Sequence, residues 1–143
     1  MKMSKTRLFV SKKLSANILI YIKNKQHHFL KNVLRIKKED SINLFDGFTG
    51  EWLSKVISIN RDNIVLQIQN KLRDIPKETD LWLIFAPIKS YRMNITIQKA
   101  TELGISRFIP ILTEYTNQSK INFQNFELNM IEASEQSERL SIP

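Results

Sequence analysis

The stretch KSYRMNITIQKATELG, residues 89–104, constrains the fold of this chain more than any other part of it. It lies between two apolar runs, at 81–87 and 107–112, that are typical of short strands. A strand, helix, strand series of this length predicts a parallel pair joined by a right-handed crossover. The polar loop that opens the stretch then lies at the C-terminal edge of the sheet, where open α/β sheets bind their ligands. Because the run at 81–87 is continuously apolar, we expect its strand to be covered on both faces.

The same stretch predicts a helix with one apolar and one polar face. The apolar residues recur near the helical period: Met93, Ile97 and Ala100, with Ile95 and Leu103 widening the buried face. Gly104 is placed to end the helix in a left-handed cap. On the polar face Gln98 and Glu102 lie four residues apart, with Lys99 beside them and Arg92 just before the first turn. These polar residues are either ordinary solvated helix residues or members of a site, and the pattern leaves both readings open.

Positive charge is concentrated in the first quarter of the chain. The formal net charge is +8, and residues 1–38 contain 11 of the 22 Lys and Arg but none of the 14 Asp and Glu. Such a block favours a polyanionic partner such as RNA, because each neutralised phosphate releases counterions. A solvated, lysine-rich surface explains the same pattern equally well.

The residue inventory excludes several kinds of site. The chain has no cysteine and only two histidines, the adjacent His27 and His28, so disulfides are excluded and metal ligands are few. No apolar run reaches the roughly 20 residues that span a bilayer, and the N-terminus lacks the apolar segment of a signal peptide. We therefore expect a soluble, cytoplasmic protein with neither a membrane partner nor a metal.

Residues 1–72 have the pattern of a small β domain with one short helix. Strands are predicted at 7–10, 18–22, 42–44, 52–59 and 64–69, with a hairpin at 60–63 between the last two. Phe29, Val33 and Ile36 predict a short helix that ends near Arg35. The polar segment 71–80 predicts a linker to a second domain, in which a final helix is expected at 126–140.

The chain resembles the ribosomal RNA small-subunit methyltransferase E family, of the SPOUT class, over nearly its whole length. The similar segments occur in the family's order: RLFV, HHFLKNVLR and INLFDG, then KSYRMNITIQKATELGI, RFIPILTEYT and EASEQSERLSIP. The resemblance implies an α/β fold in which an N-terminal PUA-like β-barrel, residues 1–72, precedes the first part of a SPOUT (trefoil-knot) methyltransferase domain, residues 73–143. It implies methyl transfer from S-adenosylmethionine to N3 of a uridine in 16S-type small-subunit ribosomal RNA, a step in ribosome biogenesis. It also implies a homodimer.

The resemblance assigns site residues as well. Arg92, Glu102 and Glu135 are expected at the catalytic centre, where a carboxylate can accept the N3 proton and a cation can stabilise charge on the uracil oxygens. A local ion pair is a competing explanation for Glu135 and Arg139, because they lie four apart in a predicted helix with the acid N-terminal. Their occurrence in EQSER, which resembles the family, favours the functional role. RNA contacts are expected from Arg7, Lys31, Arg35, Lys89, Gln98, Lys99 and Arg139.

Three positions depart from the family pattern. Tyr91 replaces an acidic residue, Tyr115 replaces an arginine, and Glu138 lies where the family has a small residue. The glycine-rich loop that holds the methyl donor in the family has no counterpart, since the three glycines of this chain lie elsewhere. We therefore expect the cofactor-binding residues and the knot to be absent, through a shortened chain or a decaying gene, and the chain to be inactive alone.

Two other functions are compatible with the sequence. One is a non-catalytic RNA-binding module that uses the basic N-terminal region. The other is a protein-interaction or assembly factor whose basic face is merely solvated. The salt dependence of RNA binding separates these two, because only phosphate neutralisation makes affinity fall steeply with salt.

Overall fold

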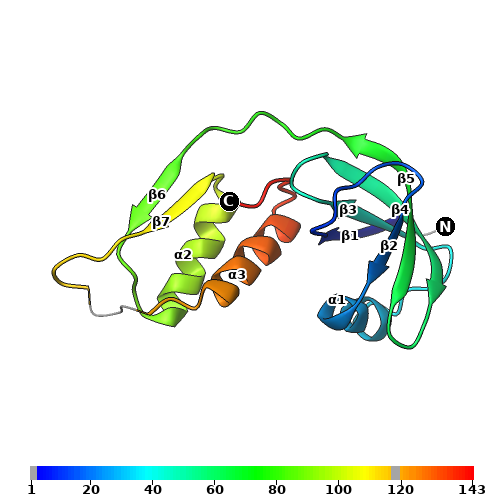
Figure 1. The fold of residues 1–143 in the computed structure, drawn as a ribbon, viewed down its shortest axis with the longest axis horizontal. Helices are drawn as coiled ribbons and strands as arrows, with labels where there is room; N and C mark the ends of the chain where they lie inside the picture. The colour runs from blue at the N-terminus through cyan, green and yellow to red at the C-terminus, as the bar shows by residue number, and fades with distance from the viewer. Residues whose placement is uncertain (1–2, 117–119) are drawn as a thin grey trace. The chain divides into compact units, whose positions relative to one another are not determined.

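The computed structural model describes residues 3–116 and 120–143, and the chain divides into two compact units, Met1–Ile75 and Pro76–Pro143 (Figure 1). Each unit has its own core of buried apolar side chains. No helix in the described residues is long and apolar enough to cross a membrane.

Unit 1 is built on one five-stranded mixed sheet in the order β1-β3-β4-β5-β2. The strands are β1 (Met3–Phe9), β2 (Leu19–Ile22), β3 (Ser41–Phe45), β4 (Glu51–Ile59) and β5 (Ile64–Arg73). β1 runs parallel to β3, and the other neighbouring pairs are antiparallel. β1 and β2 are the edges of the described sheet, which is not closed, so the barrel stays a prediction.

The β4–β5 hairpin shows how the sequence builds this core. Ile64, Leu66 and Ile68 are fully buried, because alternate side chains of a strand point to the same face. The turn is closed where predicted, by a 2.8 Å hydrogen bond from the Asn60 amide to the Asn63 carbonyl. β5 continues through Lys71–Arg73, which were predicted to begin the linker, because these residues still pair with the start of β4.

The predicted single helix before Arg35 is instead two short segments, α1 (Asn24–His28) and the π-helix η1 (Phe29–Val33). Phe29 and Val33, whose spacing predicted the helix, are 40% and 60% exposed. The reason is a wider turn: the Leu34 amide donates to the Phe29 carbonyl, five residues back, so the apolar spacing no longer falls on one face.

Unit 2 confirms the strand, helix, strand series. β6 (Trp82–Phe85) and β7 (Arg107–Pro110) pair in parallel, with α2 (Ser90–Glu102) between them in the chain and α3 (Phe123–Gln136) after them. Figure 1 shows α2 and α3 side by side, with their first residues at the same end. Phe126 of α3 lies between the strand residues Phe85 and Phe108, with ring centroids 6.2 and 5.5 Å away.

Three expectations for unit 2 were wrong. β6 is not covered on both faces: Trp82 and Ile84 are 45% and 58% exposed, because the two helices pack on the opposite side, against Phe85 and Phe108. Ile95 and Leu103 are exposed too, since the buried face of α2 is Met93, Ile97 and Thr101, spaced four apart. The last helix ends at Gln136 and not at Leu140.

The end of α3 has the geometry of a Schellman motif. Glu138 has a φ of +61°, and the Arg139 amide donates to the Ser134 carbonyl at 3.1 Å. A side chain with a Cβ is disfavoured in this left-handed conformation, whereas glycine adopts it readily. The small residue that the family pattern has near this position therefore fits the backbone better than glutamate does.

We predict that Glu138→Gly makes unit 2 more stable than Glu138→Ala does, by about 1 kcal/mol in the free energy of unfolding. Both variants remove the carboxylate, so the comparison isolates the cost of a Cβ at positive φ. Denaturant unfolding can be followed by Trp82 fluorescence in a Trp52→Phe background, because each unit contains one of the two tryptophans. Equal stability of the two variants would contradict the prediction.

Candidate functional site

The C-terminal turn of α2 brings together three of the residues expected in the site. The Gln98 amide nitrogen donates to Oε1 of Glu102 at 3.0 Å, and Lys99 Nζ lies 2.8 Å from Oε2. The hydrogen bond from Lys99 is the main reason that the pKa of Glu102 is lowered. An ionised carboxylate with both oxygens engaged is a weak proton acceptor near neutral pH, and it is better suited to orienting a polar ligand.

The other candidates on this helix lie at its opposite end. Arg92 is within the first turn of α2, and not before it as predicted, and Lys89 precedes the helix; both are exposed. The ten residues from Arg92 to Glu102 correspond to about 15 Å of helix. α2 therefore presents two separate polar clusters, and one small substrate group cannot contact both.

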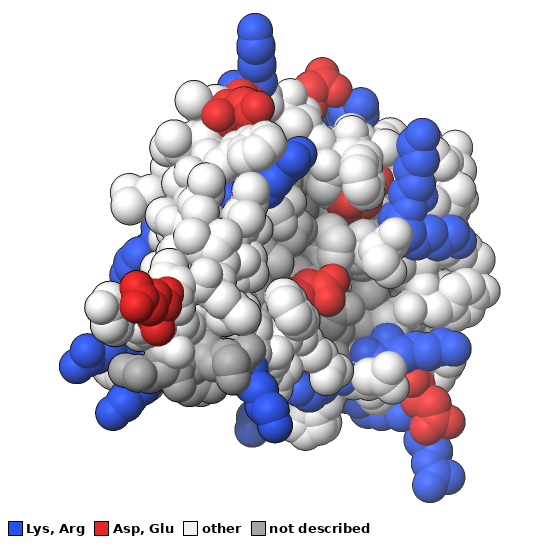
Figure 2. All heavy atoms as spheres, turned by 60° about the vertical axis from the view of Figure 1, so that its left-hand side comes forward, with Lys and Arg blue, Asp and Glu red and all other residues white. Residues whose placement is uncertain are grey.

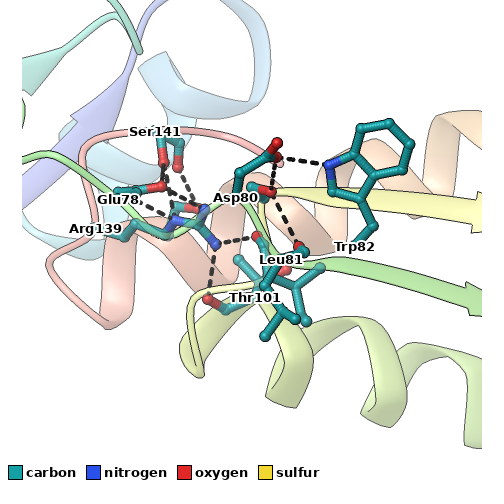
Figure 3. A network of polar contacts seen from close by, with 10 residues as sticks. Glu78, Asp80, Leu81, Trp82, Thr101, Arg139 and Ser141 are labelled. Carbon is teal, nitrogen blue, oxygen red and sulfur yellow. Dashed lines mark hydrogen bonds and ion pairs between the residues drawn. The ribbon is translucent and has the colours of Figure 1, made fainter.

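Arg139 lies inside unit 2, with 7% of its side chain exposed. Its guanidinium donates to both Glu78 carboxylate oxygens and, through Nη1, to the carbonyls of Thr101 and Ile105 at 3.0 and 2.6 Å (Figure 3). Thr101 lies in the last turn of α2, and its carbonyl also accepts from the Gly104 amide at 3.1 Å, so Arg139 adds a side-chain donor at the C-terminal end of this helix. Ser141 adds a hydrogen bond to Glu78.

No pattern in the sequence pointed to Glu78 as the partner of this arginine. Burial opposes ionisation of Glu78, but the hydrogen bonds from Arg139 and Ser141 together with the Arg139 charge outweigh it, so its pKa is lowered. Asp80, two residues on, accepts from the Trp82 indole at 2.6 Å and from Ser106, and the Arg107 guanidinium lies 4.4 Å from the Trp82 ring centroid. These contacts join the start of β6 to the start of β7.

Arg7 is also buried, in unit 1. Its Nε lies 2.6 Å from Oε1 of Glu51, while Arg73 Nε lies 2.5 Å from Oε2 of the same carboxylate. Burial is the largest single influence on Glu51 and opposes its ionisation, but the two arginines outweigh it and lower the pKa. The side chains of Arg7 and Glu51 are each 6% exposed, so these contacts stabilise the sheet from within.

The remaining candidates are on the surface of their units. Lys31 is partly exposed and donates to the Asn60 carbonyl at 3.0 Å, and Arg35 is exposed with a φ of +52°. Glu135 is partly exposed in the last turn of α3. Figure 2 shows both basic and acidic side chains on the face drawn.

Two hollows in the described part of unit 2 differ in size and in their lining residues. One, of about 40 Å³, lies where Met93 and Asn94 of α2 meet Phe126 of α3, and it is far below the roughly 300–1,000 Å³ of ligand pockets. The other, of about 500 Å³, is open to solvent and lined by Glu78, Glu102 and Arg139, whose charges are already engaged. Within the described residues, no group of acidic and histidine side chains could hold a metal ion.

Comparison with known proteins identifies both halves of the chain. Residues 76–143 match the family described as RNA methyltransferase domain, and residues 22–69 match the RNA methyltransferase PUA domain. Ribosomal RNA small subunit methyltransferase E of Rickettsia conorii is 33% identical over 99% of this chain and 58% of its own length. The protein of that name from Buchnera aphidicola subsp. Schizaphis graminum is 28% identical over 100% of this chain and 61% of its own length. The chain thus spans about three fifths of these relatives.

Solved structures share the fold at lower identity. A methyltransferase from Legionella pneumophila in complex with SAM matches with a TM-score of 0.85 at 22% identity, over 100% of this chain and 61% of that one. Ribosomal RNA small subunit methyltransferase E from Neisseria gonorrhoeae, bound to S-adenosyl methionine, matches with a TM-score of 0.85 at 22% identity. The match covers 99% of this chain and 60% of that one. The chain is thus of the class that joins a PUA domain to an RNA methyltransferase domain. Within that class it belongs to the ribosomal RNA small subunit methyltransferase E family.

Proposed function

We propose that this chain is the RNA-handling part of an enzyme that transfers a methyl group from S-adenosylmethionine to N3 of a uridine in small-subunit ribosomal RNA. The observation that carries the proposal is the match to the Rickettsia conorii methyltransferase along 99% of the chain at 33% identity. The structures of relatives with bound S-adenosylmethionine support the choice of methyl donor.

Unit 1 supplies RNA affinity in this proposal. In this proposal, residues 1–72 form a PUA-like domain, and residues 73–143 form the first part of a SPOUT domain. Residues 1–38 contain 11 Lys and Arg and no acidic residue, which suits a phosphate backbone. Of the predicted contacts in this unit, the surface positions of Lys31 and Arg35 suit RNA better than the buried position of Arg7 does.

In this proposal, unit 2 supplies polar groups for the RNA at both ends of α2. Glu102 with Gln98 and Lys99 forms one such group, and Arg92 with Lys89 supplies positive charge at the other end of α2. Glu135 is the remaining carboxylate proposed for the catalytic centre. Because this chain has no counterpart of the glycine-rich loop that holds the methyl donor in the family, we propose that donor binding and methyl transfer require residues outside this chain. We also propose that the whole cytoplasmic enzyme is a homodimer.

The RNA-binding part of the proposal is tested by salt titration. We expect fluorescence anisotropy to show binding of the chain to a small-subunit ribosomal RNA fragment, with log affinity falling linearly with log salt. Lys31→Gln is expected to reduce the magnitude of that slope by roughly 0.7–0.9, the effect of losing one phosphate contact. Lys77→Gln makes the same charge change at an exposed site in unit 2 and is expected to leave the slope unchanged. Absence of binding at low salt would contradict the proposal.

The basic N-terminal quarter also favours a second candidate function, a non-catalytic RNA-binding module. Both candidates predict salt-sensitive RNA binding, so only a methyl-transfer measurement separates them. If the chain were instead a protein-interaction or assembly factor, neither salt-sensitive RNA binding nor methyl transfer would be expected.

A further inference from the structure

The loop between β3 and β4 carries an exposed aromatic ring that is not among the candidate site residues described above. Phe48 lies in this loop, residues 46–50, and is 80% exposed. Its neighbours in sequence are Gly47 and Thr49, neither of which has a large apolar side chain. A single exposed ring does not make the contiguous apolar patch that marks hydrophobic docking of a protein.

The loop is held in place by Asp46, which is 1% exposed. Its Oδ1 accepts from the amides of Phe48 and Thr49 at 2.8 and 2.7 Å, and its Oδ2 accepts from the Thr49 hydroxyl. The Thr49 hydroxyl in turn accepts from the Trp52 indole at 2.9 Å. Because the backbone of Phe48 is tied to a buried carboxylate, little conformational freedom is lost when the ring binds a partner.

The same carboxylate brings a second, basic segment to the loop. The Leu14 amide donates to Asp46 Oδ2 at 2.8 Å, and the two residues before Leu14, Lys12 and Lys13, are exposed. Leu14 itself is buried, which fixes the end of this segment. Asp46 thus ties the backbone that precedes the Phe48 ring and the backbone that follows the two exposed lysines to one buried carboxylate. The exposed acid beside the loop is Asp74, which pairs with Lys71 at 2.9 Å.

We propose that Phe48, Lys12 and Lys13 bind single-stranded RNA, with an unpaired base stacked on the Phe48 ring and the lysines on the neighbouring phosphates. An exposed ring combined with cations on a rigid surface is the arrangement by which proteins bind unpaired nucleotides of any sequence. A paired strand buries its base faces in the helix, so the ring contributes nothing to binding a duplex. This inference rests on the proposed function, because it names the form of RNA that unit 1 contacts.

The test compares the 143-residue chain with Phe48→Leu and Phe48→Tyr by fluorescence anisotropy, using a labelled single-stranded RNA and a fully paired RNA of the same length. We expect Phe48→Leu to bind the single strand about 5- to 150-fold more weakly, the range for loss of one stacked base. Phe48→Tyr keeps a ring and is expected to bind like the wild type. Duplex affinity is expected to be the same for all three, and thermal unfolding checks that both variants stay folded.

Lys12→Gln/Lys13→Gln is expected to weaken binding of both RNAs and to reduce the magnitude of the single-strand salt slope by roughly 1.4, or 0.7 for each phosphate. If the wild type binds single-stranded RNA and Phe48→Leu binds it equally well, the stacking inference is overturned, the proposed function stands, and Phe48 is left as a contact for a protein. Equal weakening on single strand and duplex also overturns it. Failure of the wild type to bind either RNA at low salt overturns the proposed function as well.

Discussion

Replacing Glu51 by alanine is expected to lower the free energy of unfolding of unit 1 by about 3–5 kcal/mol. Glu51 is 5% exposed and pairs with Arg7 and Arg73, so its removal takes away the carboxylate that the buried Arg7 guanidinium contacts at 2.6 Å. Denaturant unfolding followed by Trp52 fluorescence measures the effect in a Trp82→Phe background. A loss below about 1 kcal/mol, the usual value of an exposed ion pair, would contradict this account.

Two controls separate the buried charge from simple loss of contacts. Arg7→Met/Glu51→Leu is expected to be less destabilised than Glu51→Ala, because the double variant removes the buried guanidinium together with the carboxylate. Arg73→Ala is expected to cost less than Glu51→Ala, because the Arg73 side chain is 41% exposed and water replaces its partner. Equal losses in all three variants would mean that charge burial is not the cause.

The effect of Glu51 is also expected to depend on pH. Its pKa is lowered in the folded state, so its stabilisation is complete above the unfolded value of about 4.3 and is lost as the pH falls through the folded value. The difference in unfolding free energy between wild type and Glu51→Gln should therefore be constant from pH 7 to about 5 and shrink below about 4. A free-energy difference between the two proteins that grows as the pH falls would contradict the prediction.

Arg139→Ala is expected to destabilise unit 2 by about 3 kcal/mol, and Arg139→Lys by nearly as much. The guanidinium makes a forked contact with Glu78 and also caps the end of α2, and an ammonium group cannot reproduce that geometry. Glu78→Gln keeps a hydrogen-bond acceptor and the size of the side chain, so it is expected to destabilise unit 2 less than Arg139→Ala does. Denaturant unfolding reported by Trp82 gives the three values.

The same variant decides between two roles of Arg139. The resemblance predicts an RNA contact, whereas the contacts within unit 2 describe a structural residue. If the structural role is sufficient, Arg139→Ala binds RNA like the wild type at a temperature where circular dichroism shows it folded. Weaker binding and a smaller salt slope in the folded variant would support the RNA contact.

Local patterns in the sequence predicted the parts of the fold that depend on local spacing. The four-residue spacing of Gln98 and Glu102 predicted their contact, and Gly104 ends the α2 region at a φ of +94° as expected. The π-helical turn at Phe29 was missed, because apolar spacing indicates a helix but not which carbonyl each amide selects. Leu103 was misplaced because it follows the last residue of α2 and points to solvent.

Contacts between distant residues could not be predicted in this way. Arg139 and Glu78 are 61 residues apart, and Arg7 and Glu51 are 44 apart. No periodicity links such positions, and only the folded chain brings them together. As a result, two arginines assigned to RNA by resemblance have partners within their own units, while Phe48 and the lysines near it were left out of the predicted site.

Methyl transfer into small-subunit ribosomal RNA tests the central claim most directly. Residues 1–143 can be joined to the part of the Rickettsia conorii relative that follows the matched region, and the fusion incubated with small ribosomal subunits and isotopically labelled S-adenosylmethionine. Nucleoside mass spectrometry is expected to find label in N3-methyluridine with the fusion, and none with the 143-residue chain alone. Label in another nucleoside, or transfer by the 143 residues alone, would contradict the account.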